Sequence, residues 1–322
     1  MIKIGLAPNR VGFGRNWPSL WNSSDGKSEE FMNPQNIRYL VISPVRDEEN
    51  HLPNTIRSMA AQSIRPTEWI IVNDGSTDKT GQILDEAAKK YPWIRPIHRV
   101  NRGFRKSGGG VVEAFNDGYK VATLQERDFI VKLDGDLSFE LDYFEKCFSR
   151  FEKDPQLGVG GGVIVHIFNG ERQVETNPEF HVRGATKIYR QACWEAIGGF
   201  WAAPGWDTMD EVKASMLGWK TRSFPDLELV HHRVTGAADG TWANLVKNGR
   251  ANYICGYHSL FMLSKCLVRL PQKPFLLGSF ALFYGYASGY FKGIPQVDDR
   301  TTIAYLRRQQ INRLLGQDTI WK

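Results

Sequence analysis

Residues 128–139 read DFIVKLDGDLSF, and this stretch joins a buried strand to a pair of carboxylates. Its first half, FIVKL, is typical of a strand that is covered on both faces. Asp134 and Asp136 follow at the strand exit, with only Gly135 between them. Two carboxylates this close together at the edge of the core indicate either a turn of the backbone or a binding site that uses both side chains.

The same pattern of strand then helix precedes this stretch three times. Such alternation predicts an α/β protein with a mostly parallel sheet flanked by helices. Ligands bind beyond the carboxyl ends of the strands in sheets of this kind, and both Asp74 and Asp134 follow such ends. The expected strands are RYLVISPV from Arg38, EWIIVND from Glu68 and IRPIHRV from Ile94, and the expected helices are 48–61, 78–91 and 111–123.

The region after Leu157 contains further predicted elements and a change in character. GVGGGVIVHIF and LELVHH are expected strands, and helices are expected at 191–197 and 209–217. The last 80 or so residues are more aromatic and basic, and they favour helices. We therefore expect three parts: an irregular N-terminal extension at 1–36, a catalytic domain at 37–235, and a helical, membrane-associating region at 236–322.

Composition restricts the class of partner. The chain has 322 residues, 42% of them hydrophobic, with a net charge of +6 that no run of like charges concentrates. Nucleic acid is therefore not expected as a partner, whereas phosphorylated small molecules or anionic lipid are. The four cysteines form no metal-ligand spacing, and no apolar signal segment opens the chain. Free thiols and a cytoplasmic location are expected.

One uncharged segment is a candidate for contact with a membrane. Residues 274–291, PFLLGSFALFYGYASGYF, carry no charge and are flanked by Lys273 and Lys292. The length is at the lower edge of a membrane span, which needs about 20 residues. Glycine, serine and tyrosine make the segment only weakly hydrophobic. A span, a buried helix and a helix resting on the membrane surface all remain open.

The spacing of Asp134 and Asp136 suits a hard cation. Two carboxylates either side of a glycine can converge on Mg²⁺ or Mn²⁺, and such an ion keeps positions open for phosphate oxygens. The alternative is a turn in which these residues only shape the backbone.

A second acidic cluster, DTMDE at residues 207–211, precedes a helical run. Thr208 and Glu211 fit a capping box, in which they only begin the helix. Asp210 is then left without a structural role, and a carboxylate in a cleft can deprotonate a hydroxyl.

Two further stretches add polar groups. His231 and His232 are adjacent on an expected strand, so one of them at most faces a site, where an imidazole could complete a metal shell. NRGFRKSGGG places Arg102, Arg105 and Lys106 before a glycine-rich helix start, which suits a diphosphate. A solvated basic loop is the alternative for these three residues.

Taken in order, these motifs resemble those of the family 2 glycosyltransferases, which are inverting enzymes of GT-A fold. The resemblance covers residues 38–232. IIVNDGSTDKT is similar to the nucleotide-binding motif of that family, LDGD to its metal-binding DxD motif, and DTMDE to the motif that holds its general base. VISPVRDEENHLPNTIRSMAAQS is similar to its opening segment, and VRGATKIYRQACWEAIGGF to its acceptor-side segment.

The resemblance implies roles for individual residues. Asp210 would be the base, with Glu211 and Asp207 as the fallback residues. A divalent cation, Mn²⁺ or Mg²⁺, would be held by Asp136, Asp134 and His231. The residues implied to bind the nucleotide are Pro44, Arg46, Glu48, Asp74, Ser76, Arg105, Lys106 and Asp134.

The resemblance also implies a reaction. One sugar would pass from a nucleotide-sugar, with UDP favoured, to a hydroxyl of a glycan or lipid-linked acceptor. Polymerisation is not expected, because QxxRW of processive members is absent and Leu314 stands where its Trp would be. Basic residues among the apolar ones at 259–291 suit contact with an anionic membrane, at its cytoplasmic face.

Two other functions share some of these features. A haloacid-dehalogenase-like phosphohydrolase also has a strand followed by DxD, but on its first strand rather than after three strand–helix pairs. A non-catalytic nucleotide-sugar-binding protein would keep the scaffold without the reaction. Donor turnover distinguishes the second from an enzyme.

Overall fold

A computed structural model describes residues 37–104, 108–168, 170–233 and 240–321 of the chain. The expected N-terminal extension at 1–36 lies outside these residues. So do Arg105 and Lys106, two of the three basic residues expected to contact a diphosphate. The structure therefore gives no account of either prediction.

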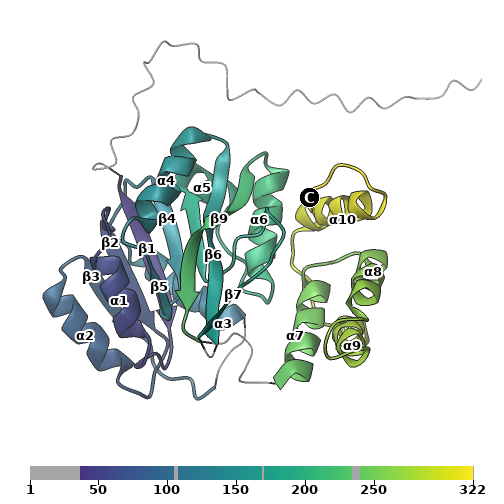
Figure 1. Ribbon diagram of the computed structural model, residues 1–322, viewed down its shortest axis with the longest axis horizontal. Helices are drawn as coiled ribbons and strands as arrows, with labels where there is room; N and C mark the ends of the chain where they lie inside the picture. Colours follow the sequence, from purple (N-terminus) through teal and green to yellow (C-terminus); the bar gives the residue numbers. More distant parts are fainter. Residues whose placement is uncertain (1–36, 105–107, 169, 234–239, 322) are drawn as a thin grey trace, which may run out of the picture. The chain divides into compact units, whose positions relative to one another are not determined.

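Four parallel strands form one half of the sheet, in the order β3-β2-β1-β4. Helices connect them as the alternation predicts (Figure 1). The first helix begins four residues later than position 48, because Pro53 occupies its first turn, where proline is well tolerated. The elements are β1 (Tyr39–Val45), α1 (Leu52–Ala60), β2 (Glu68–Asn73), α2 (Thr80–Lys90), β3 (Ile94–His98), α3 (Gly109–Lys120) and β4 (Phe129–Leu133).

The other half of the sheet is mixed. Beyond β4 the order continues β8-β6-β9-β5, with β7 paired to β6. β8 runs antiparallel to both β4 and β6, whereas β6 and β9 pair in parallel. Among the described strands, the parallel arrangement is therefore continuous across the first four and returns only between β6 and β9. The elements are β5 (Leu137–Phe139), α4 (Tyr143–Lys153), β6 (Leu157–Phe168), β7 (Glu171–Val174), β8 (Thr186–Arg190), α5 (Gln191–Ile197), α6 (Trp206–Met216) and β9 (Lys220–His231).

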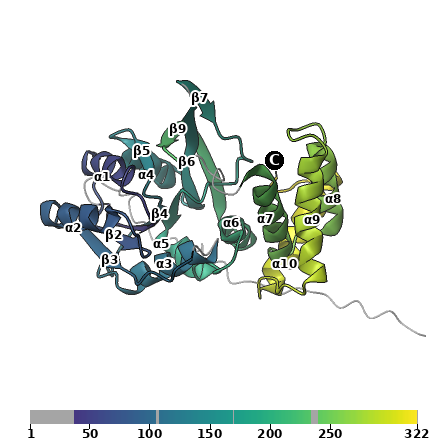
Figure 2. The ribbon, with the colours of Figure 1, turned by 90° about the horizontal axis from the view of Figure 1, so that it is seen from below.

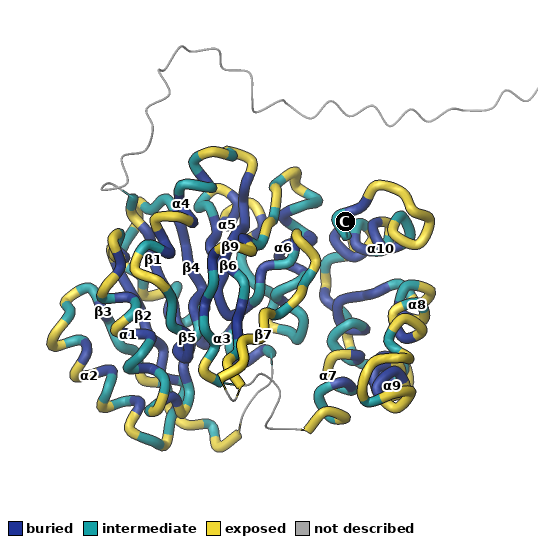
Figure 3. The backbone as a smooth tube through the Cα atoms, viewed as in Figure 1, coloured by how far each residue is buried: buried dark blue, intermediate teal, exposed yellow. Residues whose placement is uncertain are grey.

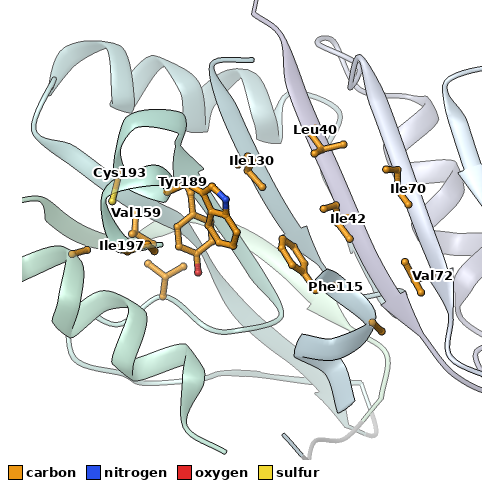
Figure 4. Packing of buried hydrophobic residues seen from close by; sticks show 14 residues of the cluster. Leu40, Ile42, Ile70, Val72, Phe115, Ile130, Val159, Tyr189, Cys193 and Ile197 are labelled. Carbon is orange, nitrogen blue, oxygen red and sulfur yellow. The ribbon is translucent and has the colours of Figure 1, made fainter. Parts of the chain in front are cut away.

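Both faces of the central strands are covered, as their continuous apolar sequences predict (Figure 3). Alternate residues of β1 and β2, Leu40, Ile42, Ile70 and Val72, point to the face on which Phe115 of α3 lies (Figure 4). On the opposite face, the Tyr39 ring lies 5.2 Å from Phe144 and 4.9 Å from Phe148, both on α4. Helices on both faces exclude water from these strands, and burial of their apolar side chains stabilises the fold.

The sheet has a reversal point beside β1. β2 and β3 lie on one side of β1, and β4 lies on the other. Connections that leave in opposite directions open a crevice at the carboxyl ends of the strands. β1, β2 and β4 end at Val45, Asn73 and Leu133, directly before the polar residues that the sequence singles out.

The last part of the described chain is helical, as predicted. α7 (Gly240–Ile254), α8 (Ser259–Arg269), α9 (Leu277–Phe291) and α10 (Arg300–Leu314) lie side by side, with α6 next to them (Figure 2). A second core cluster joins Met209 and Val212 of α6 to Tyr253, Met262 and Leu306 of these helices. Contacts group the described residues into one compact unit.

The cysteine prediction is confirmed, since all four cysteines, Cys147, Cys193, Cys255 and Cys266, are buried free thiols. The segment at 274–291 forms α9, which buries one face against α7 and exposes the other. Within the described ranges, no helix combines the length and apolar character that crossing a bilayer requires.

Candidate functional site

The loops after β1 and β2 are bound to each other by hydrogen bonds. The Asp47 N–H donates to Ser76 Oγ at 2.9 Å, and the Thr77 N–H donates back to Asp47 Oδ1 at 2.8 Å. The Asp74 N–H donates to the Val45 carbonyl at 2.8 Å. The two loops therefore form one rigid edge. Ser76, one of the residues expected to bind the nucleotide, lies within this edge.

Asp74 lies at this edge with both carboxylate oxygens occupied by arginines. Arg99 Nη1 lies 2.5 Å from its Oδ1, and Arg102 forms an ion pair with its Oδ2. The side chain is 12% exposed. The next residue, Gly75, has φ of +71°, and a Cβ there would lie 2.5 Å from Asn101 Cα. Only glycine allows the arginine segment to approach so closely.

Arg46 and Glu48 hold neighbouring segments at the same edge, beside Pro44 of β1. Arg46 donates to the Phe104 carbonyl at 3.2 Å and to Asn101 Oδ1 at 3.1 Å. Glu48 is buried, and its Oε2 lies 2.9 Å from Arg233 Nη2. Arg233 follows β9, so this contact joins the first strand–helix loop to the end of the last strand.

Asp134 and Asp136 have different surroundings. Asp134 forms an ion pair with Lys132 and keeps 28% of its side chain exposed. Asp136 is 8% exposed, its Oδ2 lies 3.1 Å from His231 Nε2, and its buried Oδ1 has no hydrogen-bond partner among the described residues. The structure thus brings together Asp136 and His231, two of the three expected metal ligands.

Charge and burial shift the pKa values of these groups in opposite directions. Burial raises the pKa of Asp134, although Lys132 opposes the rise. Burial alone would raise the pKa of Asp136 as well, but the His231 hydrogen bond and the charges of His231, Arg233 and Lys132 hold it below its ordinary value. Asp136 is therefore a carboxylate at neutral pH.

The two histidines point to different partners, as adjacent residues of a strand should. His231 faces Asp136. His232 Nε2 lies 2.9 Å from Ser138 Oγ, and its ring stacks on that of His51 at 5.9 Å. Across the described residues, no group of three or more His, Cys, Asp or Glu side chains is arranged to hold a metal ion.

Trp206 connects the Asp134 region to the second acidic cluster. Lys132 and Lys187 are cross-strand partners in β4 and β8. The Nζ atom of each lies 5.7 Å from the centre of the Trp206 ring. Lys132 pairs with Asp134, and Lys187 pairs with Asp210. The DxD motif and the start of α6 are therefore parts of one charged layer.

Asp210 and Glu211 lie fully inside the protein. Lys187 Nζ is 2.9 Å from both carboxylate oxygens of Asp210 and 2.8 Å from Glu211 Oε1. Tyr189 also donates its hydroxyl to Asp210. Burial raises the pKa of Asp210 to about 6, although Lys187 opposes the rise. Neither carboxylate has solvent-exposed surface with which to meet a substrate.

The capping-box interpretation of Thr208 and Glu211 is wrong. α6 begins at Trp206, two residues before Thr208, with Gly205 as its N-cap. The Glu211 carboxylate instead accepts the Val182 N–H at 2.7 Å and lies 2.8 Å from His181 Nδ1. Glu211 therefore fixes the segment before β8 rather than the helix end.

Asp207 is accessible to solvent, unlike Asp210 and Glu211. It lies in the first turn of α6, half-buried, and its carboxylate packs beside Gly184. Gly205, which precedes the helix, has φ of +85°, and a Cβ there would lie 2.3 Å from Cys255 Sγ. The close approach of Cys255, the residue that follows α7, thus requires glycine at this turn.

Asp207 and Thr208 line a cavity of about 820 Å³ between the start of α6 and the C-terminal helices. The other walls come from α7, α8 and the end of the chain. The lining residues used below are Asn248, Asn252, Tyr257, Lys265, Arg269, Arg313 and Trp321.

Several polar residues of the site were not singled out by sequence reasoning. Lys132 and Lys187 lie inside strands, where alternation suggests solvent-facing positions rather than a buried layer. Arg99 and Arg233 follow strands β3 and β9, which is the signal that could have identified them. Arg102, one of the three basic residues that suit a diphosphate, forms an ion pair with Asp74.

The model of glycosyl transferase family 2 matches residues 40–203, which are 164 of the 322 residues. The chain is 31% identical over 121 residues to an uncharacterized glycosyltransferase, EpsJ of Bacillus subtilis, covering 38% of this chain and 32% of EpsJ. It is 29% identical over 117 residues to chondroitin synthase of Pasteurella multocida, covering 36% of this chain and 11% of that enzyme. The match thus spans a third or less of either relative.

Solved structures share the fold. The mannosyltransferase PcManGT of Pyrobaculum calidifontis, solved with GDP-Man and Mn²⁺, superposes with a TM-score of 0.53 at 16% identity, covering 89% of this chain and 90% of that one. Residues 1–349 of Staphylococcus aureus TarS superpose with a TM-score of 0.50 at 18% identity, covering 87% and 79%. The chain therefore has the GT-A fold with a helical C-terminal part, as expected.

Proposed function

The chain belongs to glycosyl transferase family 2, and from this membership we propose that it transfers one sugar from a nucleotide-sugar to an acceptor hydroxyl with inversion. The family and the fold support transfer from a nucleotide-sugar donor. We propose UDP as the nucleotide and a glycan or lipid-linked molecule as the acceptor. One observation supports this most: the DxD carboxylates and the start of α6 belong to one charged layer around Trp206.

The donor would lie along the edge formed by the loops after β1 and β2. Asp74, Ser76, Arg46 and Glu48 lie at or next to this edge. Arg233 belongs there too, since its Nε lies 4.0 Å from Asp136 Oδ2. A guanidinium beside the DxD motif would favour the diphosphate as negative charge grows on it.

The residues present fit a divalent cation. Asp136 has a buried oxygen with no hydrogen-bond partner among the described residues, and His231 adds an imidazole beside it. Carboxylate and imidazole donors suit Mn²⁺, and carboxylate with phosphate oxygens suits Mg²⁺. We propose that Asp136 and His231 hold the ion, with Asp134 nearby. When bound, it would supply positive charge at the leaving diphosphate.

We propose Asp207, ahead of Asp210, as the general base. A base must come within hydrogen-bond distance of the hydroxyl that it deprotonates. Asp207 lines a cavity, whereas Asp210 and Glu211 are fully buried. Asp210 and Glu211 would then hold Lys187, and Lys187 donates to the Asp207 main-chain carbonyl. They position the start of the helix rather than touch the acceptor.

Contact with an anionic membrane surface is the last part of the proposal. Large apolar side chains are exposed along α8 and α9 and the turn between them. Lys273 lies in that turn, and Lys292 follows α9. Such a surface suits the boundary between lipid headgroups and acyl chains, at the cytoplasmic face of a membrane. The exposed residues are Leu260, Leu263, Leu267, Val268, Leu270, Phe275, Leu276, Leu277, Phe280, Phe283, Tyr284, Tyr290 and Phe291.

The test is thermal unfolding of the full chain with UDP- and GDP-sugars, each with and without Mn²⁺. A ligand that binds only the folded state raises the unfolding midpoint. We expect a metal-dependent rise with UDP-sugars, followed by slow release of UDP. Binding without any release of nucleotide, even with acceptor mixtures, would favour a non-catalytic nucleotide-sugar-binding protein instead.

A further inference from the structure

The cavity beside Asp207 carries an excess of positive charge. Its charged lining residues are Asp207 and three cations, Lys265, Arg269 and Arg313. The cations come from α8 and α10, and thus from a part of the chain that the family model does not match. A cavity with this lining favours an anionic ligand.

None of the three cations has a carboxylate partner among the described residues. Lys265 Nζ lies 5.5 Å from the centre of the Tyr257 ring. Arg269 donates to Gln272 Oε1 at 3.2 Å and to the Lys273 carbonyl at 3.5 Å, and its buried Nε has no hydrogen-bond partner among the described residues. A buried guanidinium N–H without an acceptor is costly, so Arg269 Nε, together with two further cations that line the same cavity, indicates an anionic ligand.

We propose that this cavity binds the acceptor, and that the acceptor carries a phosphate group held by Lys265, Arg269 and Arg313. This inference rests on the proposed glycosyl transfer. The neutral part of the acceptor would lie against Asn248, Asn252, Tyr257 and Trp321, which offer amide groups and aromatic faces. Its hydroxyl would lie at Asp207.

The transfer balances without any further reactant. The acceptor oxygen forms a bond to the anomeric carbon of the donor sugar, and the bond from that carbon to the diphosphate oxygen breaks. The diphosphate leaves with the electron pair, and the hydroxyl proton passes to Asp207. The acceptor phosphate is unchanged, since it serves only for binding.

Two sources could supply this phosphate: a soluble phosphorylated glycan, or the headgroup of a lipid-linked acceptor. Val268 and Leu314 also line the cavity and are exposed, so an apolar chain attached to the phosphate could leave along α8. The two sources share the contacts to the cations and differ in this apolar contact.

The experiment is isothermal titration of the full chain with inorganic phosphate and with citronellyl phosphate, a short prenyl phosphate. The test variant is Lys265→Ala/Arg313→Ala, and both of these side chains are exposed. The matched control, Lys89→Ala/Lys153→Ala, removes two exposed lysines from α2 and α4. We expect Kd to rise about tenfold or more in the test variant only, because charge-assisted hydrogen bonds are lost.

The outcomes separate the possibilities. Tighter binding of citronellyl phosphate than of phosphate supports the lipid source, and equal binding supports the soluble one. No binding of either probe, or equal Kd values in the wild type and the test variant, overturns the inference. Asp136→Ala should still bind the phosphate probes but should no longer bind nucleotide-sugars. A failure of the proposed donor site can therefore be distinguished from a failure of this cavity.

Discussion

Lys132 and Lys187 lie opposite each other in β4 and β8, and the Nζ atom of each is 5.7 Å from the centre of the same Trp206 ring. The two lysines serve different carboxylates. Lys132 holds Asp134, which is partly exposed, and Lys187 holds Asp210 and Glu211, which are fully buried. This difference in burial makes the consequences of removing each lysine different.

Lys187→Met should destabilise the fold by roughly 3–5 kcal/mol, because it leaves two buried carboxylates without their cation. Lys132→Met is the matched control, since it removes the opposite lysine from the same ring. Asp134 can be hydrated when its partner is lost, so the control should cost about 1–3 kcal/mol. Urea unfolding of both variants measures the difference. Equal losses would contradict the structural role of Lys187.

Asp207→Asn should lower kcat by about 10²–10⁴-fold while donor binding and unfolding midpoint stay unchanged, because the amide cannot accept a proton. Asp210→Asn should instead lower the unfolding midpoint, because it removes one of the two buried carboxylates that pair with Lys187. Steady-state kinetics together with thermal unfolding distinguish the two. If Asp210→Asn were stable but transferred no sugar, and Asp207→Asn stayed active, Asp210 rather than Asp207 would be the general base.

Asp136→Ala should abolish the metal-dependent part of nucleotide-sugar binding. In the wild type, a ligand at a hundred times its Kd should add about 2.7 kcal/mol to the free energy of unfolding. The variant, or the wild type with chelator, should lose that gain. Asp142→Ala is the control, because Asp142 lies at the start of α4 and, among the described residues, forms an ion pair only with exposed Lys146. A gain that survives in Asp136→Ala would place the ion elsewhere.

Stability should depend on pH through His181. Burial opposes a charged His181, but the Glu211 carboxylate outweighs it and raises the pKa of the imidazole. The folded state therefore binds this proton more tightly than the unfolded state does. The stabilisation is full below about pH 6.5, the ordinary histidine pKa, and is lost as pH rises through the raised value. Urea unfolding at several pH values should show this loss in the wild type, and the same slope in His181→Asn would refute it.

The apolar surface of α8 and α9 should bind anionic vesicles. Phe280→Ser/Phe291→Ser, which changes two exposed rings, should weaken flotation with phosphatidylglycerol vesicles. Val100→Ser/Leu141→Ser changes two exposed apolar residues outside α8 and α9 and should have no effect. Neutral vesicles should bind the wild type less, because Lys273 and Lys292 contribute electrostatically. A wild type that ignores both vesicle types contradicts membrane contact.

The parallel half of the sheet could be predicted from the sequence because its strands are continuous apolar runs. β1, β2 and β4 are buried along their whole length, so their sequences are unambiguous. α4 was not predicted, and its buried face is built from Tyr143, Phe144, Phe148 and Phe151, aromatic residues that favour strands as readily as helices. Tertiary packing against β1 and β4, rather than local propensity, determines this helix.

The residues of the candidate site could be predicted only in part, because tertiary packing determines their surroundings too. A sequence motif identifies candidate carboxylates. Whether each one can meet a substrate depends on its burial, and burial depends on partners that are distant in the chain. Lys187, which pairs with Asp210 inside the protein, precedes it by 23 residues and lies on β8, whereas Asp210 lies on α6. Likewise, the contact of α7 with Gly205 closes the wall beside Asp207, and no local pattern announces that contact.

The residues that line the cavity beside Asp207 come mostly from one part of the chain. Of its lining residues, Pro178 alone lies within the stretch matched by the family model, and most of the others belong to residues 245–321. The donor edge, by contrast, is built almost entirely from residues 44–136. The proposed function and the proposed acceptor cavity thus assign acceptor choice and donor choice to separable stretches of sequence. A chimera that exchanges the helices after residue 240 for those of a relative should inherit the relative's acceptor while keeping this chain's donor.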